Sequence, residues 1–164
     1  MPYDVECRDC GAHAWVNDIV DLLSHYTNKA GRFVCTSCGK TDTFIYRNSD
    51  FQEGPEERGE RWIKGVIQID SGMPTYCPYV FLTANSEDGP IVGLHFHYYK
   101  DRHSLPGGRL LYGYCPGGPP VLNREHLFMI LRHLVRRGML DRGELRTLVD
   151  GLEVYRAITS ATNA

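Results

Sequence analysis

The 164-residue sequence predicts an α+β fold, in which an N-terminal cysteine-rich module leads into a small antiparallel sheet and a helical hairpin ends the chain. Three observations predict this architecture. Two Cys-x-x-Cys-Gly turns stand near the N-terminus. Short runs rich in β-branched and aromatic residues, separated by turn signals, fill the middle of the chain. Near the C-terminus, apolar residues recur at helical spacing in two stretches.

Composition narrows the class of protein. Hydrophobic residues make up 42% of the chain and charged residues 23%, which are ordinary values for a globular protein. The net charge of −2 argues against a protein whose whole surface grips nucleic acid, although a local basic patch is compatible with it. No apolar run approaches the roughly 18 residues that span a bilayer, and the start is too polar for a signal peptide. We therefore expect a cytoplasmic protein with reduced thiols.

The two cysteine turns predict a metal site. They read CRDCG at 7–11 and CTSCG at 35–39, and 24 residues separate Cys10 from Cys35. Two residues between cysteines let one tight turn direct both sulfurs at the same ion, and the glycine that follows adopts positive φ without a Cβ clash. Together the turns offer four thiolates, enough to close a tetrahedral site. The predicted ligands are Cys7, Cys10, Cys35 and Cys38.

With these motifs, residues 7–39 resemble the zinc ribbons and the rubredoxin-like group. The resemblance covers the first part of the chain only, and the rest resembles no family in a comparable way. It implies a small metal-stapled sheet with one structural zinc ion, and it implies no particular activity. Iron is the alternative metal, but the second turn reads CTSCG and not the CPxCG typical of rubredoxin. Two disulfides or four free thiols are the other alternative.

The first 61 residues predict a zinc-binding module over 1–50 and a polar linker or loop over 51–61. The sequence favours a strand over 3–7 that enters the first turn. Asn17 is the expected N-cap of an amphipathic helix over 18–27. A hairpin with the metal at its tip follows, with strands over 32–35 and 43–47.

The central segment, 62–118, reads as antiparallel strands joined by turns. The predicted strands cover 62–70, 79–83, 91–99 and 109–115. A strong Asp-Gly turn signal lies between the second and third of these strands.

The last part of the chain predicts a helical hairpin over 119–158 and a frayed tail over 159–164. Asn123 caps its first helix and Gly138 ends it. Asp141 and Glu144 fit a capping box for the second helix. The predicted buried stripes are Leu127, Ile130, Leu131 and Leu134 on the first helix and Leu145, Leu148, Val149 and Leu152 on the second.

A second metal site is one hypothesis for the central segment. His95 and His97 are two apart on a predicted strand, so both rings lie on one face, and Asp101 and His103 follow. This stretch resembles the first metal motif of cupins, from Gly89 to Gly108, with aspartate in place of the usual glutamate and no second motif downstream. The alternative is a sheet face whose histidines serve packing or solvation.

Cys77 and Cys115 both occur in Tyr-Cys-Pro. They could join His95 and His97 in a Cys₂His₂ zinc site, or one of them could be the nucleophile of a Cys–His dyad. The sequence favours two buried thiols, which is how isolated cysteines usually behave.

The predicted hairpin is locally basic on an acidic chain. Its arginines are Arg124, Arg132, Arg136, Arg137, Arg142 and Arg146. Arg132 and Arg136 are one helical turn apart, so they can line one face with Arg137 beside them. Such a face can contact phosphates or an acidic protein surface, or it can be a solvated helix face.

These observations favour a non-enzymatic, zinc-stabilised binding or regulatory module. Its unidentified partner is a protein or a nucleic acid, contacted through the sheet face or the basic helical hairpin. A metal-dependent enzyme built on His95 and His97 is the second hypothesis. An iron–thiolate redox protein is the third.

Overall fold

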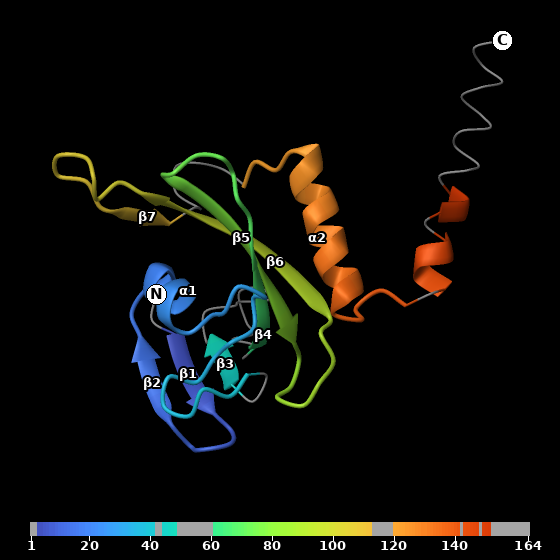
Figure 1. Ribbon diagram of the computed structural model, residues 1–164, viewed down its shortest axis with the longest axis horizontal. Coiled ribbons are helices and arrows are strands. Elements are labelled where there is room, and N and C mark those ends of the chain that lie inside the picture. The colour runs from blue at the N-terminus through green and yellow to red at the C-terminus, as the bar shows by residue number, and fades with distance from the viewer. Residues whose placement is uncertain are drawn as a thin grey trace, which may run out of the picture. The chain divides into compact units, whose positions relative to one another are not determined.

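The computed structural model describes residues 3–41, 44–48, 61–112, 120–141, 143–147 and 149–151 (Figure 1). The chain divides into two units, Met1–His126 and Leu127–Ala164. The class is α+β, as predicted. Most of the predicted linker, residues 51–60, and the predicted tail, 159–164, lie outside the described residues. The predicted domain boundaries stay predictions.

A seven-stranded sheet forms the first unit, and every neighbouring pair of strands in it is antiparallel. Its strands are β1 (Tyr3–Cys7), β2 (His13–Val16), β3 (Phe44–Asn48), β4 (Arg61–Gln68), β5 (Tyr76–Ala84), β6 (Gly93–Asp101) and β7 (Leu110–Tyr112). Their order across the sheet is β2-β1-β3-β4-β5-β6-β7. The strands of the cysteine-rich module therefore continue the central sheet, which is larger than the small sheet the sequence predicts.

The pairing of the N-terminal strands differs from the predicted hairpin. β1 lies between β2, which the sequence did not predict, and β3. The segment predicted as a strand over 32–35 forms only isolated bridges, between Phe33 and Thr27 and between Val34 and Thr41. Both edges of β3 are occupied, by β1 and β4, so this segment has no edge on which to pair. The predicted strand over 32–35 is wrong for this reason.

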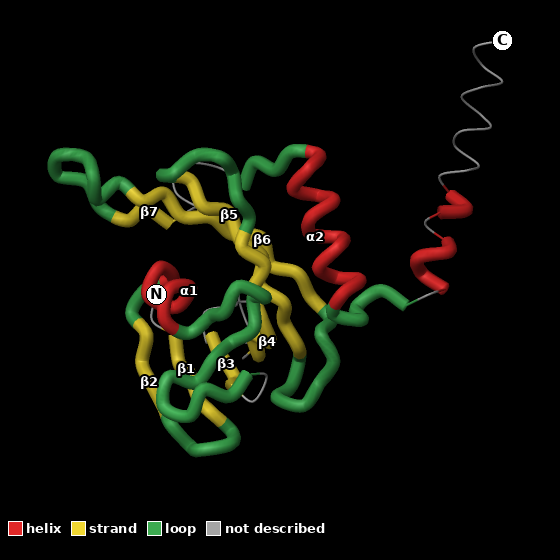
Figure 2. Tube along the Cα trace, in the orientation of Figure 1, coloured by secondary structure: helices red, strands yellow, loops and turns green. Residues whose placement is uncertain are grey.

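The helix α1 (Ile19–His25) begins one residue later than predicted. Its N-cap is Asp18 and not Asn17, because the Asp18 carboxylate accepts the backbone N–H of Asp21 at 2.8 Å. Ile19, Leu22 and Leu23 are buried, so the predicted apolar stripe faces the core. In Figure 2 the helix lies beside the N-terminal strands.

The core of the first unit connects the N-terminal strands to the central strands of the sheet. Phe81, on β5, packs edge-on against Tyr3 of β1 with ring centroids 6.2 Å apart, and against Tyr79 at 5.1 Å. Cys7 and Cys35, the first cysteine of each turn, belong to the same cluster of buried residues. The cysteine turns are thus anchored in the core of the sheet.

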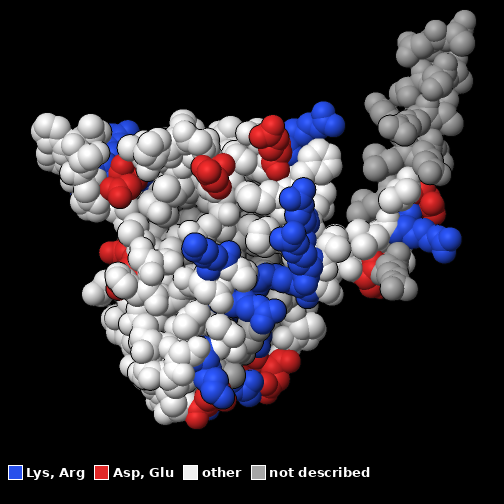
Figure 3. Space-filling model, in the orientation of Figure 1, with Lys and Arg blue, Asp and Glu red and all other residues white. Residues whose placement is uncertain are grey.

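The helix α2 (Arg124–Arg136) begins and ends where the sequence predicts. The Asn123 carboxamide accepts the N–H of His126 at 2.9 Å, and the His126 ring accepts the N–H of Asn123 at 3.2 Å. Gly138 then takes a φ of 68° and stops the helix. Basic side chains follow α2 in the space-filling view of Figure 3.

The buried line of α2 is narrower than predicted. Ile130 and Leu134 are buried, as expected. Leu127, predicted to be buried with them, is 54% exposed, and Leu131 is half-buried. The buried residues His126, Ile130 and Leu134 follow each other at four-residue steps, and Leu127 lies one residue off this line. Leu127 therefore faces solvent.

The predicted second helix has its capping box. Asp141 and Glu144 exchange backbone-to-carboxylate hydrogen bonds of 2.8 Å each, and residues 143–147 and 149–151 are helical. Of its predicted buried stripe, Leu145 is half-buried, and Val149 is 52% exposed and therefore not buried as predicted. The other two members, Leu148 and Leu152, lie outside the described residues.

Candidate metal centre

The two cysteine turns have the same backbone geometry. In the first, the N–H of Gly11 donates to the Cys7 carbonyl at 2.9 Å, and in the second the N–H of Gly39 donates to the Cys35 carbonyl at 2.8 Å. The N–H of the first cysteine also bonds the carbonyl five residues ahead in both turns, at 2.8 Å and 3.0 Å. The turns are therefore two copies of one local structure, as their matching sequences predict.

The glycine of each turn is required by its backbone conformation. Gly11 has a φ of 67° and Gly39 a φ of 71°, in the left-handed region that other residues rarely adopt. A Cβ built on either glycine would meet nothing within 4 Å. The demand for glycine is thus one of conformation and not of space.

The four sulfurs lie together. All four Sγ atoms are within 4.8 Å of one another. Across the turns, the Sγ atoms of Cys7 and Cys38 are 3.6 Å apart, as are those of Cys10 and Cys35. A disulfide would bring two sulfurs to about 2.0 Å, whereas a tetrahedron with metal–sulfur bonds of about 2.3 Å separates them by roughly 3.8 Å. The spacing suits one tetrahedrally coordinated ion and excludes the disulfide alternative.

The four candidate ligands differ in solvent exposure. Cys7 and Cys35 are buried, with 0% and 1% of their surface exposed, whereas Cys10 and Cys38 are exposed. The inner pair comes from the ends of core segments and the outer pair from the tips of the turns. An ion held here would join the core to the surface turns, and protein sulfurs would fill all four coordination positions.

The electrostatics of the cluster call for a cation. Burial alone would raise the pKa of the Cys7 thiol, but the backbone N–H groups of Cys10 and Asp9 bond its sulfur and lower it to about 6. The Cys38 thiol behaves in the opposite way. The N–H of Lys40 lowers its pKa, but burial and the three neighbouring thiols raise it to about 12. Four thiolates at this distance need a positive ion to coexist.

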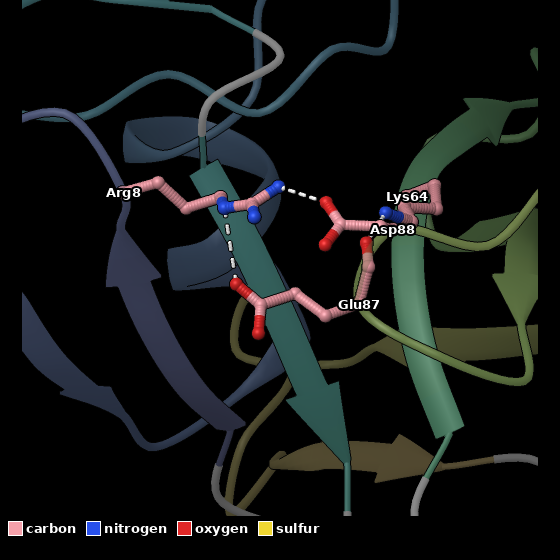
Figure 4. A network of polar contacts seen from close by, with 4 residues as sticks. All are labelled: Arg8, Lys64, Glu87 and Asp88. Carbon is pink, nitrogen blue, oxygen red and sulfur yellow. Dashed lines mark hydrogen bonds and ion pairs between the residues drawn. The ribbon is translucent and has the colours of Figure 1, made fainter.

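A network of charged residues ties the first turn to the loop between β5 and β6 (Figure 4). The guanidinium of Arg8 bonds Glu87 at 3.0 Å and Asp88 at 2.5 Å. The Lys64 ammonium donates a hydrogen bond to the backbone carbonyl of Glu87. The hydrogen bond from Arg8 lowers the pKa of Asp88, and burial lowers the pKa of Lys64. Sequence reasoning missed this contact, because its partners are 80 residues apart and carry no local signal.

Lys64 reaches the loop because of an irregularity in β4. The register between β4 and β5 shifts between Ile63 and Gly65, so Lys64 is the extra residue of a β-bulge. The bulge lets Ile63 stay fully buried while the neighbouring ammonium is redirected toward Glu87.

The histidines of β6 lie on the aromatic side of the sheet. The His97 ring stacks on Tyr79 with centroids 5.5 Å apart and an interplanar angle of 18°, and lies 5.6 Å from Phe81. Burial, aided by the charge of His95, lowers the pKa of His97 to about 4. These contacts describe a packed, neutral imidazole at neutral pH.

The other two members of the predicted second metal site form a separate pair. Asp101 accepts the backbone N–H of His103 at 3.0 Å and contacts its ring at 2.8 Å, in an exposed turn. Among the described residues, the four cysteines are the one group of three or more candidate ligand side chains close enough to share an ion. The second metal site at His95, His97, Asp101 and His103 stays a prediction.

The remaining cysteines are divided between described and undescribed residues. Cys77 is half-buried on β5 opposite Tyr99. Burial and a hydrogen bond with the Cys77 thiol raise the pKa of Tyr99. Cys115 lies outside the described residues, so the predicted pairing of the two thiols with the histidines stays a prediction.

The basic residues of α2 gather toward its C-terminal end. Arg132 and Arg136 are exposed and Arg137 is half-buried. Burial lowers the pKa of His133, and so do the charges of these three arginines, which shows that they share one field. Arg142 lies outside the described residues.

We expect Cys35→Ser to abolish metal binding. Serine keeps the size of the side chain but removes a thiolate, and a structural site depends on all four ligands. Elemental analysis of protein purified without chelators should give about one ion per wild-type chain and close to none for the variant. Cys77→Ser is the matched control and should keep the ion. Equal metal content in both variants would contradict the assignment.

We expect His97 to make stability depend on pH. The folded protein holds the imidazole neutral, so between pH 6.5 and about 4 the unfolded chain binds the extra proton. The free energy of unfolding should therefore decrease as the pH is lowered from 6.5 to about 4, by at most about 3 kcal/mol. Urea unfolding at several pH values, for wild type and His97→Phe, isolates the effect because other titrating groups are common to both. If the free energy of unfolding changed with pH equally in the wild type and in His97→Phe, His97 would not be held neutral.

No helix among the described residues has both the length and the apolar content needed to cross a membrane. Comparison with protein-family models, with curated proteins and with solved structures gave no match to this chain.

Proposed function

We propose that this chain is a zinc-stabilised binding or regulatory module. The observation that carries the proposal is the closed arrangement of four cysteine sulfurs, whose distances suit one tetrahedral ion. A catalytic metal keeps a coordination position open for water or substrate, whereas protein sulfurs fill every position here. The ion is thus structural, and the module acts through the surfaces it holds in place.

Zinc is the metal we assign to the site. Four thiolates at tetrahedral spacing are typical of structural zinc, and residues 7–39 resemble the zinc ribbons in motif. Iron also accepts four thiolates. The two are distinguished by the visible spectrum of the purified protein, since iron–thiolate sites are coloured and zinc sites are not. A coloured, iron-loaded protein would favour the redox alternative.

The helix α2 is the surface we assign to the partner. Arg132 and Arg136 are exposed on it, and Leu127 and Phe128 are each 54% exposed. Exposed apolar side chains beside a basic cluster are typical of interaction surfaces, because the apolar groups add affinity and the charges steer an acidic partner. The predicted hairpin over 119–158 would extend this surface, and the capping box at Asp141 supports its second helix.

The faces of the central strands are less suited to a partner. Tyr79 and Phe81 are buried on one face of β5, and Val80 and Leu82 are buried on the other. A partner therefore has little of this strand to contact, and we favour the helix over the sheet face.

Photo-crosslinking from α2 tests the proposed surface. A photoreactive phenylalanine analogue at position 127 should give crosslinked products in cells, because this side chain faces solvent beside the basic cluster. The same analogue at Val92, which is 55% exposed, is the matched control and should give few. Digestion of the products by protease or nuclease then identifies a protein or a nucleic-acid partner.

A charge variant sharpens this test. Arg132→Ala/Arg136→Ala should lower the yield from position 127 several-fold, whereas Lys29→Ala/Arg109→Ala removes the same charge from exposed positions elsewhere and should leave it unchanged. Equal yields from positions 127 and 92 would argue against α2 as the contact surface.

A further inference from the structure

A cavity of about 460 Å³ lies where β5 begins and β6 ends. Its walls come from the turn before β5, from the last residues of β6 and from Val121. This volume falls within the range of small-molecule sites, which is roughly 300–1,000 Å³. The cavity is separate from the cysteine cluster, and no residue of the metal centre lines it.

The backbone around the cavity is fixed by hydrogen bonds. The N–H of Asp101 donates to the Thr75 carbonyl at 3.0 Å, which ties the turn to β6. Within the turn, the N–H of Tyr76 donates to the Met73 carbonyl at 3.1 Å, and the N–H of Met73 donates to the Ser71 hydroxyl at 3.1 Å. The cavity is thus pre-formed, which reduces the entropy lost when a ligand binds.

Two cations line the cavity without a counter-charge. Lys100 lies on β6 and Arg102 directly follows the last residue of that strand, and both contribute to the wall. Among the described residues no carboxylate lines the cavity, and Asp101, which lies between the two cations in sequence, contacts His103 instead. Neither cation has an ion-pair partner among the residues that the structure describes. The cavity therefore favours an anion.

The remaining walls are aromatic and apolar. Tyr76 and Tyr98 lie with ring centroids 5.2 Å apart and an interplanar angle of 50°. The Lys100 ammonium sits 5.7 Å from the centre of the buried Tyr98 ring, which leaves the half-buried Tyr76 as the accessible aromatic surface. Met73 and Val121 at the rim are 56% and 76% exposed. These surfaces suit a planar, apolar ring.

Tyr76 also offers a directed hydrogen bond. Its hydroxyl oxygen accepts the backbone N–H of Val121 at 2.8 Å, which fixes the position of the ring. No described residue accepts the hydroxyl hydrogen, so a ligand oxygen can do so. The cavity then presents two cations and one neutral donor around a single aromatic surface.

We propose that this cavity binds a mononucleotide. The nucleobase lies on Tyr76 between Met73 and Val121, and the phosphate is held by Lys100 and Arg102. An aromatic surface stacks any base, and a guanidinium beside an ammonium suits a phosphate dianion. The inference goes beyond the proposed binding module, because it uses no residue of α2 and no metal ligand.

Calorimetric titration tests the site with four mononucleotides as probes, namely the 5′-monophosphates of adenosine, guanosine, cytidine and uridine. At least one should bind the wild-type protein with a dissociation constant below about 1 mM, and it should bind at least tenfold more tightly than its own nucleoside or inorganic phosphate. This difference is expected because ring and phosphate contacts act together. Binding of none of the four, or equal binding of phosphate alone, would overturn the proposal.

Variants locate the binding. Lys100→Ala/Arg102→Ala should weaken the bound nucleotide at least about tenfold, since it removes both phosphate contacts. Tyr76→Phe keeps the stacking surface, and we expect it to weaken binding a few-fold through the lost donor. The charge-matched Lys29→Ala/Arg109→Ala should bind as the wild type does. Unchanged binding in Lys100→Ala/Arg102→Ala, with its fold intact by circular dichroism, would place the nucleotide elsewhere and overturn the assignment.

Discussion

Four thiolates within 4.8 Å of one another repel each other strongly, and this constraint governs the N-terminal half of the structure. One metal ion bound here would relieve the repulsion and link the two turns, whose cysteines Cys10 and Cys35 have 24 residues between them. Because Cys7 ends β1 and both Cys7 and Cys35 belong to the core cluster that includes the buried residues of α1, such an ion would tie β1 to the α1 region. Without it, the same geometry would cost free energy instead of supplying it.

The metal centre connects to the rest of the first unit in two ways. Inside, Tyr3 on β1 meets Phe81 on β5, so the aromatic core extends from the cysteine turns to the central strands. Outside, Arg8 in the first turn holds the β5–β6 loop through Glu87 and Asp88. The opposite end of β5 and β6 carries the Tyr76–Lys100 cavity. One sheet therefore positions the metal centre at one side and the candidate ligand site at another.

The sequence predicted what local chemistry determines. The four ligands, the two turn glycines, the Asn123 cap and the Asp141–Glu144 box each depend on residues a few positions apart, and the structure contains each of them. The predictions failed where distant residues compete. The segment over 32–35 does not form the predicted strand, because β1 and β4 already occupy both edges of β3. Leu127 is exposed because the buried line of α2 is only one residue wide.

The candidate site was predictable to the same extent. Cysteine spacing identified the four candidate metal ligands, but no pattern in the sequence predicts the contact of Arg8 with Asp88. The two-residue spacing of Tyr98, Lys100 and Arg102, on β6 and just past its end, was a usable signal for the cavity, yet its other wall comes from the turn before β5. Register between strands decides which side chains meet, and a single sequence does not encode that register locally.

Hydrogen exchange before and after metal removal tests the central claim most directly. The account predicts that the wild-type protein, stripped of its ion by a chelator, loses amide protection in β1, β2 and α1 and regains it when one equivalent of zinc is returned. Protection in these elements that is unchanged by metal removal would contradict the claim that the four-cysteine centre holds this part of the structure together.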